Sequence, residues 1–124
     1  MTDIAAKLLP YRSFLSGQKE QLTASIRALE SEGRQDEANL TKVRLNIVTV
    51  FETLCWADEA YCKGDYDAFC QRYEARFQTI PSSWQAHLQT AKAHGDASAQ
   101  IIEETKLETA NEIHNVFLHR GEDA

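Results

Sequence analysis

Apolar residues recur at steps of three and four positions along most of the chain, which is the period of an amphipathic α-helix. The first helix is expected to begin after Thr2 or Asp3, either of which can cap it, and to end near Gly33. Pro10 lies inside this series, so we expect a kink or a short break there. The apolar positions of the series are Ile4, Leu8, Tyr11, Leu15, Leu22, Ile26 and Leu29.

A second helix is predicted from about Asp36, as its cap, to Lys63. The Gly64-Asp65 pair is expected to end this helix and to start the next. The apolar face is broad, which indicates a central helix that packs against more than one neighbour. Its members are Leu40, Val43, Ile47, Val48, Val50, Phe51, Leu54, Cys55, Tyr61 and Cys62.

Three shorter helices are predicted in the second half of the chain. An aromatic stripe extends from Tyr66 to Ile80, where Pro81 is expected to stop the helix. Ser82 and Gln85 have the spacing of a capping box and indicate a short helix to about residue 91. After Gly95-Asp96, a last helix is expected over 97–118, with a frayed end from residue 121.

These elements predict an all-α fold: a compact bundle of about five helices with a long antiparallel hairpin at the N-terminus. The 124 residues, at 43% hydrophobic, suit one domain spanning 1–124. This apolar fraction excludes a disordered chain, and the apolar runs are too short for a membrane span. No secretory leader is visible, and three cysteines are an odd number, so we expect a cytoplasmic protein with free thiols.

The formal net charge of −6 argues against a nucleic acid as the main partner, because no basic excess exists to neutralise phosphates. Residues 96–124 alone have a net charge of −5. Glu104, Glu108 and Glu112 follow one another at four-residue steps and form what we call the acidic stripe. It could be a docking surface for a basic partner or a solvated face.

A third interpretation of the acidic stripe lies within the chain itself. Arg12, Lys19 and Arg27 share one flank of the first predicted helix. These cations would face the stripe if the first and last helices pack together.

Asp58 lies near the centre of the apolar face of the second helix. A buried carboxylate is costly unless it is paired. It could be a catalytic acid, but more often such a residue accepts a hydrogen bond from a neighbouring Tyr, Trp or helix end. Trp56 lies on the opposite side, near Leu45, and must be covered by another helix or by a partner chain.

We find no metal or cofactor signature in the sequence. The four histidines show no His-Glu-x-x-His or Glu-x-x-His pattern, and no glycine-rich phosphate loop occurs. We therefore expect no metal and no cofactor, although a small enzyme built on Asp58 or the histidines remains an alternative.

The segment from Ala60 to Phe77, followed by Pro81, resembles the turn and second helix of a tetratricopeptide unit. Gly64, Tyr66 and Tyr73 have the spacing of that repeat, which implies a helical hairpin used for peptide binding. Our leading hypothesis is a small non-enzymatic interaction protein that self-associates. Its candidate surface consists of Leu45, Trp56 and the acidic stripe.

Overall fold

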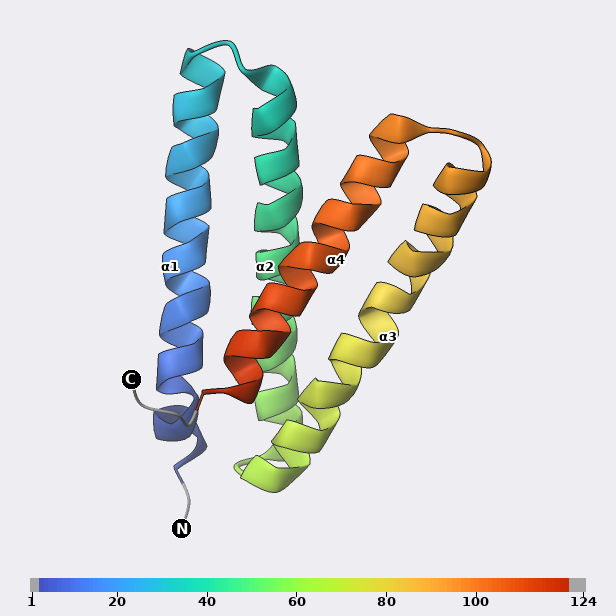
Figure 1. Ribbon diagram of the computed structural model, residues 1–124. Helices are drawn as coiled ribbons and strands as arrows, with labels where there is room; N and C mark the ends of the chain where they lie inside the picture. The colour runs from blue at the N-terminus through green and yellow to red at the C-terminus, as the bar shows by residue number, and fades with distance from the viewer. Residues whose placement is uncertain (1–2, 121–124) are drawn as a thin grey trace.

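The computed structural model describes residues 3–120, which form four α-helices joined by short turns (Figure 1). The helices are α1 (Ile4–Ser31), α2 (Gln35–Cys62), α3 (Tyr66–Ala93) and α4 (Ala97–Leu118). This part of the chain contains no strand, so the all-α prediction is confirmed, but the bundle has four helices rather than about five. Thr2 and the end predicted to fray lie outside the described residues.

The fifth helix was expected because Pro81 should stop α3, and this prediction is wrong. The helix continues through Pro81 to Ala93, and the proline ring is buried. Ser82 does not cap a new helix, because its hydroxyl donates to the carbonyl of Thr79 at 2.7 Å within the same helix. Pro81 shares a surface depression with Phe77 and with His114 of α4. We infer that this packing offsets the roughly 3 kcal/mol that a proline costs inside a helix.

Two other features differ from the sequence predictions: the helix around Pro10 and the residue that caps α2. A kink or a short break was expected at Pro10, and the break does not occur, because α1 continues through this residue. Asp36 is not the cap of α2, because the cap position is Arg34. The Arg34 guanidinium pairs with Glu32 and Glu37 instead of capping the helix. Asp36 and Glu37 lie in the first turn, where negative charge is favourable to the helix dipole.

The turns before α3 and α4 follow the predicted pattern of a glycine and then an aspartate. Gly64 has a φ of 88° and Gly95 a φ of 66°, the left-handed conformation that glycine adopts at little cost. Asp65 and Asp96 then cap the next helix, each accepting from the backbone N–H three residues later at 3.0 Å. These sequence-predicted caps are confirmed, as is Asp3 at the start of α1.

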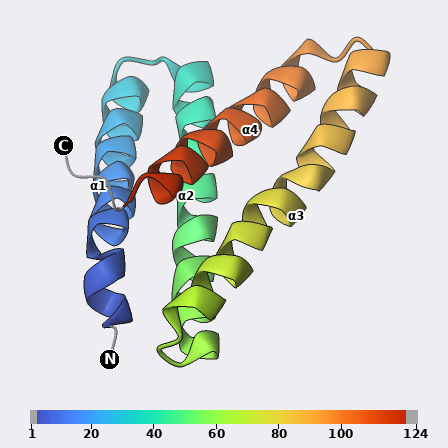
Figure 2. The ribbon, with the colours of Figure 1, turned by 60° about the horizontal axis from the view of Figure 1, so that its bottom comes forward.

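The four helices form two antiparallel hairpins, α1–α2 and α3–α4, that meet at one end (Figures 1 and 2). Toward the Gly33 and Gly95 turns the hairpins diverge, whereas α4 crosses α2 near the middle of that helix (Figures 1 and 2). Helix α2 contacts each of the other three helices, as its broad apolar face predicts. The core therefore lies where the hairpins meet, and each hairpin extends beyond it as a pair of helices.

The centre of the core is an aromatic cluster with one ring from each helix. The ring of Tyr73 in α3 lies 5.8 Å from Tyr11 of α1, 6.4 Å from Phe51 of α2 and 4.9 Å from Phe117 of α4, centroid to centroid. All four side chains are essentially inaccessible to solvent. Edge-to-face pairs such as these add to the stabilisation from burial alone.

The two buried tyrosine hydroxyls are joined in one hydrogen-bonded chain. Tyr73 Oη donates to the carbonyl oxygen of Phe51 at 2.8 Å, and the Tyr11 and Tyr73 hydroxyls lie 2.6 Å apart. Since the Tyr73 proton is directed to the carbonyl, Tyr11 is the donor to Tyr73. This pair of hydrogen bonds links α1, α3 and α2. It gives each phenol hydroxyl a hydrogen-bond partner without water.

Among residues 3–120, no helix combines the length and the apolar character that crossing a bilayer demands.

Replacing Tyr73 by Phe should lower the free energy of unfolding by about 1–2 kcal/mol. The change removes the donor to Phe51 and leaves the Tyr11 hydroxyl without its acceptor. Urea unfolding measures the loss. Tyr61→Phe is the matched control, because the side chain of Tyr61 is 67% exposed, and the control should have almost no effect. Equal losses in the two variants would contradict the role of the hydroxyl chain.

Alkaline pH should destabilise the fold through the same two tyrosines. Burial raises the pKa of Tyr11 and of Tyr73 above their ordinary value, so both stay protonated in the folded state. Unfolded tyrosines ionise near pH 10, so the unfolded chain binds fewer protons above that pH. The stabilisation is complete below about pH 10 and decreases above it.

Unfolding free energies measured from neutral to strongly alkaline pH check this dependence. Above about pH 10, the double variant Tyr11→Phe/Tyr73→Phe should lose stability less steeply than the original chain. Parallel curves would show that other groups cause the alkaline loss.

Candidate functional site

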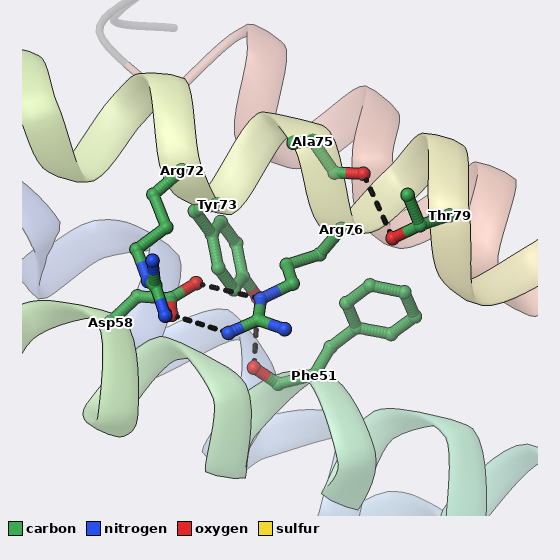
Figure 3. A network of polar contacts seen from close by, with 7 residues as sticks. All are labelled: Phe51, Asp58, Arg72, Tyr73, Ala75, Arg76 and Thr79. Atoms are coloured by element: carbon green, nitrogen blue, oxygen red, sulfur yellow. Dashed lines mark hydrogen bonds and ion pairs between the residues drawn. The ribbon is translucent and has the colours of Figure 1, made fainter.

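Asp58 of α2 is completely buried and accepts hydrogen bonds from two arginines of α3. Arg72 Nε donates to Asp58 Oδ1 at 2.9 Å. Arg76 donates from Nη2 to Oδ1 at 2.9 Å and from Nε to Oδ2 at 3.2 Å. Figure 3 shows both guanidinium groups extending from α3 toward the carboxylate on α2. One negative charge is thus enclosed by two positive charges.

The aromatic stripe of α3 determines where these arginines lie. Arg72 directly precedes Tyr73 in the sequence, and Arg76 directly precedes Phe77. Since both aromatic rings are buried, both arginines lie at the edge of the buried face, where α3 meets α2. The four-residue spacing of the arginines then lets both side chains reach Asp58.

Asp58 was expected to accept from a Tyr, a Trp or a helix end, and this expectation is wrong about the donors. Both carboxylate oxygens are engaged by guanidinium N–H groups. A general acid or base needs an oxygen that can reach substrate, so this geometry favours a structural role for Asp58. The sequence does contain a signal for the pair, namely two arginines at i and i+4 beside the stripe that faces Asp58.

An open depression of about 550 Å³ lies over the two arginines, and we call it the arginine pocket. The Arg72 guanidinium stacks on the ring of Tyr61 of α2, 3.8 Å from its centroid. The hydrogen bonds to Asp58 raise the pKa of Arg76 further above its ordinary value, so its charge is permanent. The pocket is lined by Tyr61, Cys62, Ala68, Gln71, Arg72, Ala75, Arg76 and Thr79.

The acidic stripe lies on the exposed side of α4. Glu104, Glu108 and Glu112 are all exposed, and none of them forms an ion pair with another described residue. The predicted pairing with α1 is wrong. Arg12 forms an ion pair with Glu59, and Lys19 Nζ lies 2.7 Å from Glu52 Oε1. Both cations therefore pair with glutamates of α2.

The reason is the hairpin itself: α1 packs along α2 and not along α4. Arg27, the third cation of that flank, is exposed and has no ion pair among residues 3–120.

Trp56 is 54% exposed, and no helix among residues 3–120 covers it fully. Leu45 lies three helical turns before it and is partly buried. Of the two covers that the sequence analysis allowed for Trp56, another helix of the bundle is therefore at most a partial one among residues 3–120.

The histidines do not come together. His114 pairs with Glu74 and stacks on Phe77, 4.4 Å between ring centroids. His87 Nδ1 lies 3.4 Å from Glu103 Oε1, and its side chain is mostly exposed. Within the described chain, no group of three or more His, Cys, Asp or Glu side chains could hold a metal ion.

Comparison of the chain with protein-family models, with curated protein sequences and with solved structures finds no match.

Replacing Asp58 by Asn should lower the free energy of unfolding by about 3 kcal/mol, because it leaves two guanidinium groups without their counter-charge. Chemical denaturation measures the loss. Glu104→Gln makes a comparable change from carboxylate to amide at an exposed, unpaired site and should change stability by less than about 0.5 kcal/mol. Similar effects of the two substitutions would show that Asp58 is not a structural anchor.

Proposed function

We propose that the protein is a non-enzymatic, cytoplasmic α-helical interaction protein that pairs with a second copy of itself through the outer side of the α1–α2 hairpin. The observation that carries this proposal is Trp56, a large aromatic side chain of α2 that is left half-exposed. Buried tryptophans are frequent anchors of protein interfaces. The three free thiols support an intracellular location.

Trp56 borders the seam at which α1 and α2 meet. Glu52 and Glu59 of α2 lie one helical turn to either side of Trp56, and they pair with Lys19 and Arg12 of α1. Around α2, Trp56 is about 140° from the core residue Phe51. The indole therefore lies beyond the ion pairs, on the side of the hairpin that faces away from α3 and α4.

Leu9 of α1 is on the same side of the hairpin. It is 61% exposed, lies one turn before Arg12 and is about 160° from the core residue Tyr11 around the helix. Leu9 and Trp56 thus give each helix of the hairpin one large apolar side chain on its outer side.

The charges around Trp56 favour a second copy as the partner. Arg12 with Glu59 and Lys19 with Glu52 are mixed pairs, so a two-fold symmetric contact can place cations of one copy near anions of the other. The acidic stripe of α4 would instead repel a second copy. Two hairpins stacked through Trp56 would bury both indoles between four helices.

The acidic stripe is a second candidate surface, for a basic partner. Its support is that all three glutamates are exposed and unpaired within the described chain. The tetratricopeptide alternative has less support, because α2 and α3 are 28 residues each. Two such helices and their turn exceed the repeat of about 34 residues.

Light scattering coupled to size exclusion tests the self-association. We expect a species of twice the monomer mass that dissociates on dilution. Trp56→Ala should weaken the dimer by about 2 kcal/mol, a roughly thirtyfold higher Kd. Leu118→Ala is the matched control, since Leu118 is equally exposed, at 54%, on α4. A protein that stays monomeric at every concentration, or a dimer equally sensitive to both substitutions, would refute the proposal.

A further inference from the structure

We propose that the arginine pocket binds the carboxylates of an acidic segment of a partner protein, with Arg72 and Arg76 as the carboxylate-binding residues. The pocket lies between α2 and α3, whereas Trp56 faces away from α3, so this inference is independent of the self-association.

The first support is that Asp58 holds both guanidinium groups in place before any ligand arrives. Three hydrogen bonds of 2.9–3.2 Å to the buried Asp58 carboxylate hold the guanidinium groups of Arg72 and Arg76 in position. A long arginine side chain otherwise loses much rotamer freedom when it binds. Because that ordering has already occurred on folding, the pocket is preorganised for an anion.

The second support is that donors remain free on the solvent side. Arg72 uses only Nε in its bond to Asp58, and Arg76 uses Nε and Nη2. Within residues 3–120, the terminal nitrogens Nη1 and Nη2 of Arg72 and Nη1 of Arg76 make no hydrogen bond. The two side chains are 40% and 29% exposed, so these N–H groups can reach a ligand.

The third support is the local charge. The pocket lining has two arginines and no acidic residue, and Asp58 beneath it neutralises one of the two charges. A site with a net charge of about +1 therefore lies on a chain whose net charge is −6. The exposed ring of Tyr61 stacks on Arg72 and keeps one face of that guanidinium away from water.

The shape of the pocket favours a segment over a single small ion. The α3 residues that line it extend from Ala68 to Thr79, which is about 16 Å along the helix axis. That length matches roughly five residues of an extended chain. Gln71 and Thr79 provide polar groups along the pocket, and planar carboxylates suit the guanidinium forks in its middle.

Fluorescence anisotropy with a short fluorescein-labelled oligoglutamate peptide tests the proposal on the full chain. We expect saturable binding that weakens with added salt. An oligoglutamine peptide of the same length, which lacks the carboxylates, should not bind.

Two pairs of protein variants locate the site. Arg72→Gln should raise the Kd about tenfold, whereas Arg27→Gln, the same charge change on α1, should raise it less than about twofold. Arg72→Lys keeps the charge but loses the planar pair of guanidinium donors and the stacking on Tyr61, so it should also weaken binding. Arg27→Lys should leave binding unchanged. Circular dichroism checks that each variant folds, and Trp56→Ala should bind as tightly as the original chain.

Three results would overturn the proposal. The first is the absence of saturable binding. The second is an equal loss in the Arg72 and Arg27 variants, which would mean that the peptide senses only overall charge. The third is displacement by citrate or inorganic phosphate at concentrations below the Kd of the peptide, which would identify a small-anion site instead of a peptide site.

Discussion

The buried charge of Asp58 is the constraint on which the arrangement of α2 and α3 depends. A carboxylate with no exposed surface must be paired, and both of its ion-pair partners among residues 3–120 belong to α3. Pairing fixes the position of α3 along and around α2, because both Arg72 and Arg76 must reach the same group. It also brings Tyr73 over the Phe51 carbonyl, which belongs to the same face of α2 as Asp58. Polar and aromatic contacts therefore specify one register.

The consequences extend to all four helices. Tyr73 also contacts α1, through the hydrogen bond with the Tyr11 hydroxyl, and α4, through the ring of Phe117. The positions of α1 and α4 therefore depend on where α3 lies along α2. The aromatic cluster thus joins the two hairpins, which diverge toward their far ends (Figure 1). The two functional proposals use the two sides of α2: its seam with α1 displays Trp56, and its contact with α3 displays the arginine pocket.

Much of the fold could be predicted from local signals, and the rest depends on contacts between distant residues. The Gly64-Asp65 and Gly95-Asp96 turns and the aromatic stripe were correct, because glycine stereochemistry and helical period act within a few residues. For Pro81 the local rule predicts a stop, whereas α3 continues through this residue, which is buried in the fold. Asp58 was correctly placed in the interior, but its partners lie 14 and 18 residues away on another helix. The pocket above them could therefore not be predicted from periodicity alone.

A double-mutant cycle between Asp58 and Arg76 measures whether this ion pair holds α2 and α3 together. It compares the unfolding free energies of the original chain, Asp58→Asn, Arg76→Gln and the double variant. If the buried carboxylate and the guanidinium stabilise each other, their coupling should be favourable by about 2 kcal/mol. The double variant would then lose less unfolding free energy than the two single variants lose in sum. A coupling near zero would mean that the two residues act independently, and it would contradict the claim that this charge pair sets the register of α2 and α3.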